Sequence, residues 1–231
     1  MTGWNWGGLY VGVNAGYSAG RTITDTSYNV PLAGDPLFAT NGSDKLAGGF
    51  FGAQAGYNWL ANVWAIGIEA DMQYSRQRGS ATSVCVTDIC NAALAPADAP
   101  VIVSLDHKLG WFGTLRGRLG TTVVPNTLAY VTAGVALGDI TIGGTLSGFD
   151  GAGNPSNAAV SNHLTRVGWT IGGGYESRLV GNWTGKIEYL HMDFGSVATI
   201  PAITMDATVA AVINTRLTDN IVRLGVNYKF N

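Results

Sequence analysis

The sequence is poor in charged residues and has no long apolar run. Asp, Glu, Lys and Arg make up 12% of the 231 residues, which is about half the usual share. So few charges favour a membrane protein, yet no stretch of about 18 uncharged apolar residues is present, which excludes a membrane-spanning helix. The remaining structure that satisfies every backbone hydrogen bond inside a bilayer is a closed β-barrel.

Net charge and cysteine content are also low. A formal net charge of −2 gives no indication of nucleic-acid binding. The two cysteines, Cys85 and Cys90, lie in a polar segment with no neighbouring His or Cys to complete a metal site. We expect a disulfide between them, because a barrel implies export to an oxidising compartment. We expect no metal and no cofactor.

The first residues, Met1 to Trp4, have neither the basic start nor the apolar stretch of a signal peptide. We therefore interpret the chain as a mature form.

Instead, apolar and polar residues alternate in several segments of the sequence. From Leu9 to Tyr17, every second residue is apolar, and the residues between are mostly Gly or polar. The Gly and polar set is too small to fill a dry interior, so the apolar set is expected to face lipid. Strands with this pattern are predicted at 7–20, 48–59, 63–76, 107–120, 127–142, 163–177, 182–194 and 219–230.

The links between these strands alternate in length. Short turns are expected near Asn62, near Asn126 and at 178–181, whereas 21–47, 77–106, 143–162 and 195–218 are long and polar. The pattern predicts an all-β fold, with residues 1–231 forming one transmembrane up-and-down antiparallel barrel of eight strands. We expect short periplasmic turns, four long extracellular loops and both termini in the periplasm.

Aromatic residues on the outward positions form two belts near the strand ends. Such belts flanking an aliphatic band are typical of the two interfaces of a bilayer, and they disfavour a soluble sandwich or a lipocalin-like carrier. The predicted membrane-interface residues are Trp59, Trp64, Trp183, Tyr228 and Phe230 at one end, and Tyr17, Phe51, Trp111, Trp169 and Tyr189 at the other.

Charged residues on the inward positions are candidates for a lumen network. An eight-stranded barrel is filled by side chains and unpaired buried charge is costly, so we expect these residues to form ion pairs that plug the lumen. The alternative is a narrow conduit that weakly favours anions. The set comprises four acids, Glu69, Asp71, Glu176 and Glu188, and six bases, Arg116, Arg118, Arg166, Lys186, Arg223 and Lys229.

Three histidines, His107, His163 and His191, lie near the outer strand ends. With Ser161 and Asp193 they are conceivable parts of a lipid-hydrolysing set, but no nucleophile elbow is present, so we expect no catalytic residues and no enzyme. The same histidines are candidates for contact with a flat ligand such as haem.

The predicted loops are rich in Asp and lack a calcium-binding motif. They are interpreted as solvated segments, and the alternative is that they bind divalent cations or the phosphates of the outer leaflet. The cations available for such contact are Arg21, Lys45, Arg76, Arg78, Lys108 and Arg216.

Six segments carry a family resemblance: Trp6–Tyr17, Phe51–Trp59, Trp111–Gly120, Ala129–Gly134, Gly168–Glu176 and Val222–Phe230. They resemble alphaproteobacterial immunogenic outer-membrane proteins, which are porin-like surface antigens with an OmpA/OmpX-like eight-stranded barrel. The resemblance covers nearly all strands and none of the loops. It implies an abundant structural protein of the Gram-negative cell envelope without catalytic residues. Such barrels usually end on an aromatic residue that the assembly machinery reads, whereas here Asn231 follows Phe230.

We therefore predict a surface-exposed outer-membrane protein that stabilises the envelope and presents loops for contact or adhesion. The expected partners are outer-membrane lipids and lipopolysaccharide, the barrel-assembly machinery, a host or neighbouring-cell surface and further copies of the chain, but no nucleic acid. The alternatives are a small porin-like diffusion channel and loop-mediated binding of a ligand such as haem.

Overall fold

The computed structural model describes residues 4–29, 36–85, 101–124, 126–149, 155–199 and 210–230. Within these ranges no helix has the length and apolar character needed to cross a membrane.

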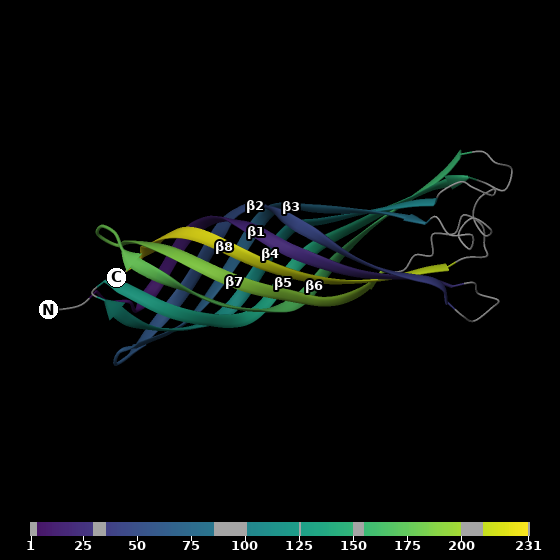
Figure 1. Ribbon diagram of the computed structural model, residues 1–231. Coiled ribbons are helices and arrows are strands. Elements are labelled where there is room, and N and C mark those ends of the chain that lie inside the picture. Colours follow the sequence, from purple (N-terminus) through teal and green to yellow (C-terminus); the bar gives the residue numbers. More distant parts are fainter. Residues whose placement is uncertain are drawn as a thin grey trace.

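Eight antiparallel strands form a closed barrel, as predicted (Figure 1). Each strand pairs with its neighbours in sequence, and the last strand closes the barrel on the first. The strands are β1 (Gly8–Asn29), β2 (Pro36–Ala61), β3 (Trp64–Cys85), β4 (Val101–Val124), β5 (Thr127–Phe149), β6 (Pro155–Arg178), β7 (Trp183–Thr199) and β8 (Ala210–Lys229).

Tight turns lie at one end of the barrel, together with both termini (Figure 1). Asn62, Asn126 and Gly181 have positive φ angles of 55°, 66° and 55° in these turns, a conformation that Asn and Gly tolerate better than other residues. We call this the turn end and the opposite end the loop end.

The strands extend much farther toward the loop end than the sequence predicted. For example, β2 begins at Pro36 and β4 at Val101, so the predicted extents of the long loops were wrong. Pairing between β1 and β2 continues through polar stretches, where Thr22 lies opposite Asp44 and Thr26 opposite Thr40. Outside a membrane such residues need no apolar face, so apolar alternation does not reveal these parts of the strands.

The barrel wall divides at the loop end. Among the described residues, β2 and β3 do not pair beyond Ala47 and Arg78, and β6 and β7 do not pair beyond Trp169 and Asp193. Strands β3 to β6 therefore continue as one sheet, and β7, β8, β1 and β2 as another, and the two sheets diverge (Figure 1). We call the gap between β2 and β3 the β2/β3 seam.

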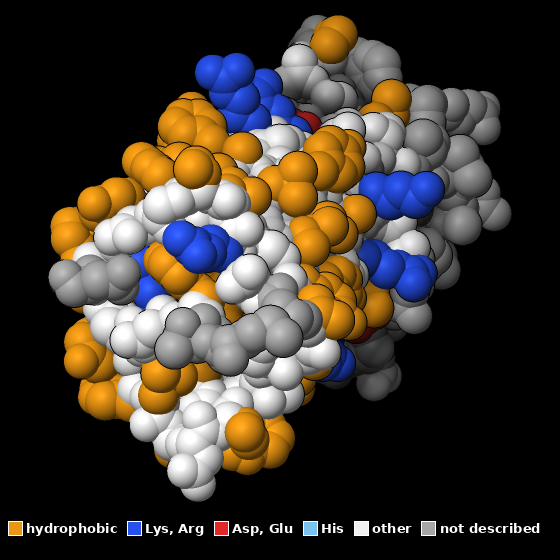
Figure 2. All heavy atoms as spheres, turned by 90° about the vertical axis from the view of Figure 1, so that its left-hand side faces the viewer, with side chains coloured by type: hydrophobic (Ala, Val, Ile, Leu, Met, Phe, Trp, Pro, Cys, Tyr) orange, Lys and Arg blue, Asp and Glu red, His pale blue; other side chains and the backbone are white. Residues whose placement is uncertain are grey.

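The outer wall is apolar. Val13, Val131 and Leu224 are each more than 60% exposed, and hydrophobic side chains cover much of the wall seen from the turn end (Figure 2). A continuous exposed apolar surface of this kind requires a nonaqueous environment.

Candidate functional site in the lumen and at the loop end

Eight charged side chains form one buried cluster across the lumen, which we call the lumen network. The guanidinium of Arg116 forms ion pairs with Glu69, with Asp71 at 2.8 Å and with Glu188 at 3.1 Å. The Lys186 Nζ lies 2.8 Å from a carboxylate oxygen of Glu69. The other members are Arg118, which pairs with Glu176, and Arg223, which pairs with Glu69, Asp71 and Glu188.

Strand alternation and register place these residues together. Glu69 and Asp71 are two residues apart on β3, so both side chains point into the lumen. Glu69 lies opposite Arg116 in the ladder between β3 and β4. Glu188 lies opposite Arg223 in the ladder between β7 and β8. Each pair joins opposite charges across neighbouring strands, an arrangement that stabilises a sheet.

Neutral side chains complete the lumen network. The carboxylate of Glu69 accepts a hydrogen bond from Tyr10 at 2.8 Å, and that of Glu188 accepts one from Tyr130 at 2.9 Å. Thr114 donates to Asp71 at 2.8 Å, and Thr184 donates to Glu176 at 2.6 Å. Four acids and four bases thus form a formally neutral cluster in which every carboxylate also has a neutral donor.

Two predicted members lie outside the lumen network. Lys229, near the turn end, donates from Nζ to the carbonyl oxygen of Gly7 at 2.8 Å. Arg166 is half-buried on β6, and its Nε has no hydrogen-bond partner among the described residues. The excess of two cations expected from the sequence is therefore divided between two places outside the network.

An apolar layer fills the lumen on the loop side of the network. On β4, Phe112 lies four residues from Arg116 toward the loop end and is 0% exposed. Its ring contacts that of Phe50 at a centroid distance of 5.3 Å. The Gly and polar character of the inward positions between Leu9 and Tyr17 does not extend to this part of the lumen. This layer could have been predicted by following the inward positions farther along each strand toward the loop end. It comprises Leu46, Phe50, Leu109, Phe112, Ala136, Ile140, Ile142, Leu190, Met192, Phe194, Leu217 and Ile221.

The segment before β1 covers the turn end of the lumen. Trp6 is 2% exposed and packs with Ala65 and Leu128. Its carbonyl oxygen accepts a hydrogen bond from Asn58 at 3.1 Å. The guanidinium of Arg178 lies 4.4 Å from the centre of a ring of Trp4. The lumen therefore contains three layers in series: this cap, the lumen network and the apolar layer.

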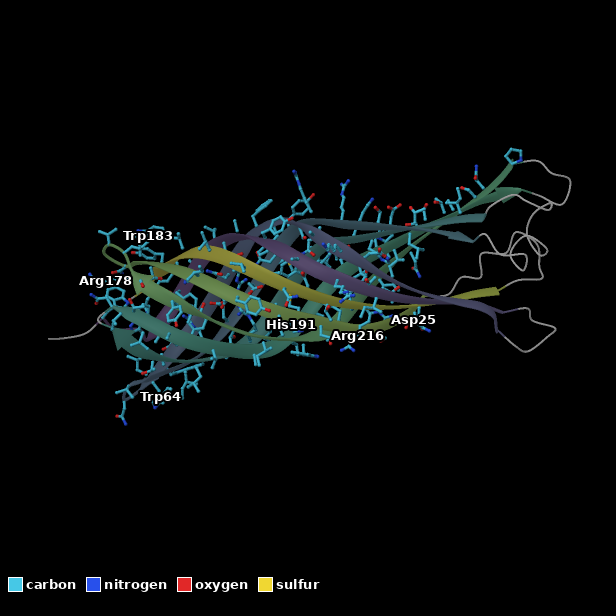
Figure 3. The ribbon with its side chains drawn as sticks, in the orientation of Figure 1. Asp25, Trp64, Arg178, Trp183, His191 and Arg216 are labelled. Carbon is cyan, nitrogen blue, oxygen red and sulfur yellow. The ribbon has the colours of Figure 1, made fainter. Side chains whose placement is uncertain are left out.

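The predicted interface aromatics lie on the outer wall. Figure 3 shows Trp64 and Trp183 at the turn end, with His191, Arg216 and Asp25 successively nearer the loop end. Trp111 and Tyr228 are half-buried, and the other eight predicted residues, Tyr17, Phe51, Trp59, Trp64, Trp169, Trp183, Tyr189 and Phe230, are exposed.

The three histidines are not brought together. His107 points into the barrel from β4 and is 2% exposed. His163 is exposed on β6 beside Thr141, with 3.0 Å between its Nδ1 and the Thr141 hydroxyl. His191 lies opposite Ile171, eight residues from His163 along β6, or about 26 Å. No shared ligand can bridge side chains so placed.

Asp193 is engaged elsewhere, since its carboxylate accepts hydrogen bonds from Arg216 at 2.7 Å and from the Gly195 amide at 2.8 Å. The described residues contain no group of three or more His, Cys, Asp or Glu arranged to hold a metal ion. The disulfide between Cys85 and Cys90 stays a prediction, because Cys90 lies outside the described residues.

Comparisons with known proteins agree with this geometry. A family model described as an outer membrane protein beta-barrel domain matches residues 1–230. The 31 kDa outer-membrane immunogenic protein of Brucella melitensis is 32% identical over 233 residues, covering 98% of this chain and 84% of that protein.

Two solved structures have a similar fold. The outer membrane protein OprG from Pseudomonas aeruginosa aligns with a TM-score of 0.51 at 13% identity, over 97% of both chains. The outer membrane protease OmpT from Escherichia coli aligns with a TM-score of 0.50 at 9% identity, over 96% of both chains. At such low identity these likenesses show the fold alone.

Proposed function

Because the chain belongs to the outer-membrane β-barrel family, we propose that it is a structural, surface-exposed barrel that stabilises the envelope and presents its loops for contact or adhesion. In this proposal the turn end faces the periplasm and the loop end faces outward, the usual arrangement of short turns and long connections in such barrels. The C-terminal strand, with Phe230 at its end, would be read by the assembly machinery.

The filled lumen is the observation that supports this role most directly. Trp6 covers the turn end, the lumen network joins opposite walls, and the apolar layer around Phe112 follows on the loop side. Ions passing through would have to break buried ion pairs and enter an apolar layer, and both are costly. The porin-like alternative therefore has less support than a plugged barrel.

Ligand capture and catalysis also have little support. His107 points into the barrel, whereas His163 and His191 lie on the outer side about eight residues apart along β6, which argues against haem binding by the set. The fold shared with a protease carries no activity to this chain, because function depends on the residues of a site. We propose that the protein acts through its wall and loops, without catalysis.

Deletion of the chain in its bacterium tests the structural role. We expect the mutant to be more sensitive to detergent, and wild-type protein to restore resistance. A variant with residues 86–100 replaced by a short Gly-Ser segment should also restore resistance but lose contact with neighbouring or host surfaces. Unchanged detergent sensitivity in the deletion mutant, at normal levels of other outer-membrane proteins, would contradict the envelope role.

Labelling of intact cells tests the orientation. A peptide tag inserted between residues 90 and 95 should react with a membrane-impermeant antibody, whereas a tag placed before Trp4 should react only after the outer membrane is opened. The reverse pattern would show that the proposed orientation is wrong.

A further inference from the structure

A polar hollow opens at the β2/β3 seam, where these two strands stop pairing. It has a volume of about 830 Å³. Its lining includes Lys45 on β2, Arg78 on β3, and His107 and Lys108 on β4. A smaller hollow of about 370 Å³ adjoins it, shares Arg78 and Lys108, and adds Arg76. We call the two together the seam hollow.

Within the described part of the chain, no acid forms an ion pair with the cations of the seam hollow. Arg78 lies directly opposite Lys108 in the ladder between β3 and β4, and both side chains are exposed. Like charges at directly opposed positions destabilise a sheet. Two acids, Asp44 and Asp106, also line the hollow, but no ion pair within 4.0 Å joins either acid to a cation of the hollow among the described residues. A bound anion would relieve the repulsion.

A buried histidine is also without a hydrogen-bond partner. His107 is 2% exposed, and neither of its ring nitrogens has a partner in the described part of the chain. Burial lowers the pKa of its imidazole, and the nearby Asp44 opposes that shift. The neutral ring carries one N–H, and a buried donor left unpaired costs free energy. His107 lines the inner side of the hollow, whereas Lys108, the next residue on β4, points to the outer side.

The seam hollow begins on the loop side of a pair of aromatic residues in the wall. Tyr74 lies opposite Trp111 in the ladder, and Arg76 follows Tyr74 by two residues. Aromatic belts mark the level at which lipid headgroups begin. Farther from the hollow, Met72 is 62% exposed on the apolar wall. The apolar wall therefore matches the acyl chains of a lipid, and the cationic hollow next to it matches the lipid headgroup.

We propose that the seam hollow binds the phosphate group of a membrane lipid, whose acyl chains lie along the wall of β3 and β4. Arg78 and Lys108, whose side chains are both exposed on the outer side of the sheet, contact the phosphate oxygens, since guanidinium groups match phosphate geometry in a bidentate manner. A lipid fits better than free phosphate, because the apolar wall adjoins the hollow. The inference deepens the proposed contact with envelope lipids and rests on the outer-membrane location.

Lipid binding to purified, folded protein in uncharged detergent tests the proposal independently of any envelope phenotype. The probes are short-chain phosphatidic acid, short-chain phosphatidylcholine and inorganic phosphate, each titrated with ³¹P NMR as the readout. The test variant is R78Q/K108Q. The matched control is R166Q/R216Q, which removes the same charge on β6 and β8, outside the hollow. A second test variant, K45Q/K108Q, covers the case in which the first does not fold, as judged by a change in gel mobility on boiling.

We expect wild-type protein to bind phosphatidic acid at least tenfold more tightly than phosphatidylcholine or inorganic phosphate. Each folded test variant should lose at least tenfold in affinity, and the control should stay within twofold of wild type. Equal losses in test and control variants would mean diffuse attraction to surface charge and would overturn the site. Equal affinity for inorganic phosphate would overturn the lipid as its ligand.

Discussion

Arginine serves opposite purposes in two regions of this barrel. In the lumen, Arg116 contacts three carboxylates and is 1% exposed. At the seam, Arg78 is exposed and faces Lys108, with no ion pair to any described acid. The first arrangement is complete within the molecule, whereas the second leaves charge available to an external group. Lumen charges should therefore determine stability, and seam charges should determine what the barrel binds.

The largest expected effect comes from breaking the lumen network. Arg116→Leu leaves Glu69, Asp71 and Glu188 buried with fewer partners, and removal of one member of a buried ion-pair cluster costs about 3–5 kcal/mol. Urea unfolding in lipid vesicles, followed by gel mobility without boiling, measures the loss. Arg118→Leu should act in the same direction through Glu176. Unchanged unfolding midpoints for both variants would contradict a structural role for the network.

A smaller loss is expected from the apolar layer. Phe112→Ala removes a fully buried ring that packs against Phe50, and the cavity should cost about 3 kcal/mol. The control is Val131→Ala on the outer wall, where the side chain is 61% exposed. Equal unfolding midpoints for the two variants would mean that the layer is not packed as described.

One hydroxyl at the edge of the lumen network tests its finer structure. Tyr10→Phe removes a hydrogen bond to Glu69 and keeps the ring, and hydrogen bonds to charged groups contribute about 1.5–3 kcal/mol. We expect a loss near the lower limit, because Lys186 and three arginines still contact Glu69. Tyr17→Phe, on the exposed wall, should leave the unfolding midpoint where it is in wild-type protein.

The smallest effect is expected at an exposed ion pair. Arg216 pairs with Asp193 at 2.7 Å, but its side chain is 55% exposed. Exposed pairs contribute little to stability because solvent screens them, so Arg216→Gln should shift the urea midpoint by less than a quarter of the Arg116→Leu shift. A shift as large as that of Arg116→Leu would remove the distinction between buried and exposed charges.

Alternation in the sequence was sufficient to predict the barrel and the direction of most charged side chains. Glu69 and Arg116 were both assigned to the lumen by inward position alone, and the register places them opposite each other. Alternation along a strand predicts whether a side chain points inward or outward, but it does not predict which layer of the lumen the side chain joins. Arg166 and Lys229 share the inward positions and yet lie outside the lumen network.

Other features depend on which ladders continue and which stop. The strand extensions toward the loop end lack apolar alternation, as Thr22 opposite Asp44 illustrates. The β2/β3 seam exists because pairing ends at Ala47 and Arg78, and no local signal in either segment marks that point. The cap formed by Trp6 is a long-range contact with Leu128. None of these follows from local pattern, because each is decided by tertiary packing.

Single-molecule conductance in a planar bilayer shows whether the lumen is closed. The sample is protein whose gel mobility changes on boiling, which shows that it is folded, and insertion is verified by protection of the strands from added protease. We predict no discrete current steps from wild-type protein, because the cap, the lumen network and the apolar layer lie in series. Reproducible steps of one amplitude from the folded, inserted protein would contradict the account and favour a diffusion channel.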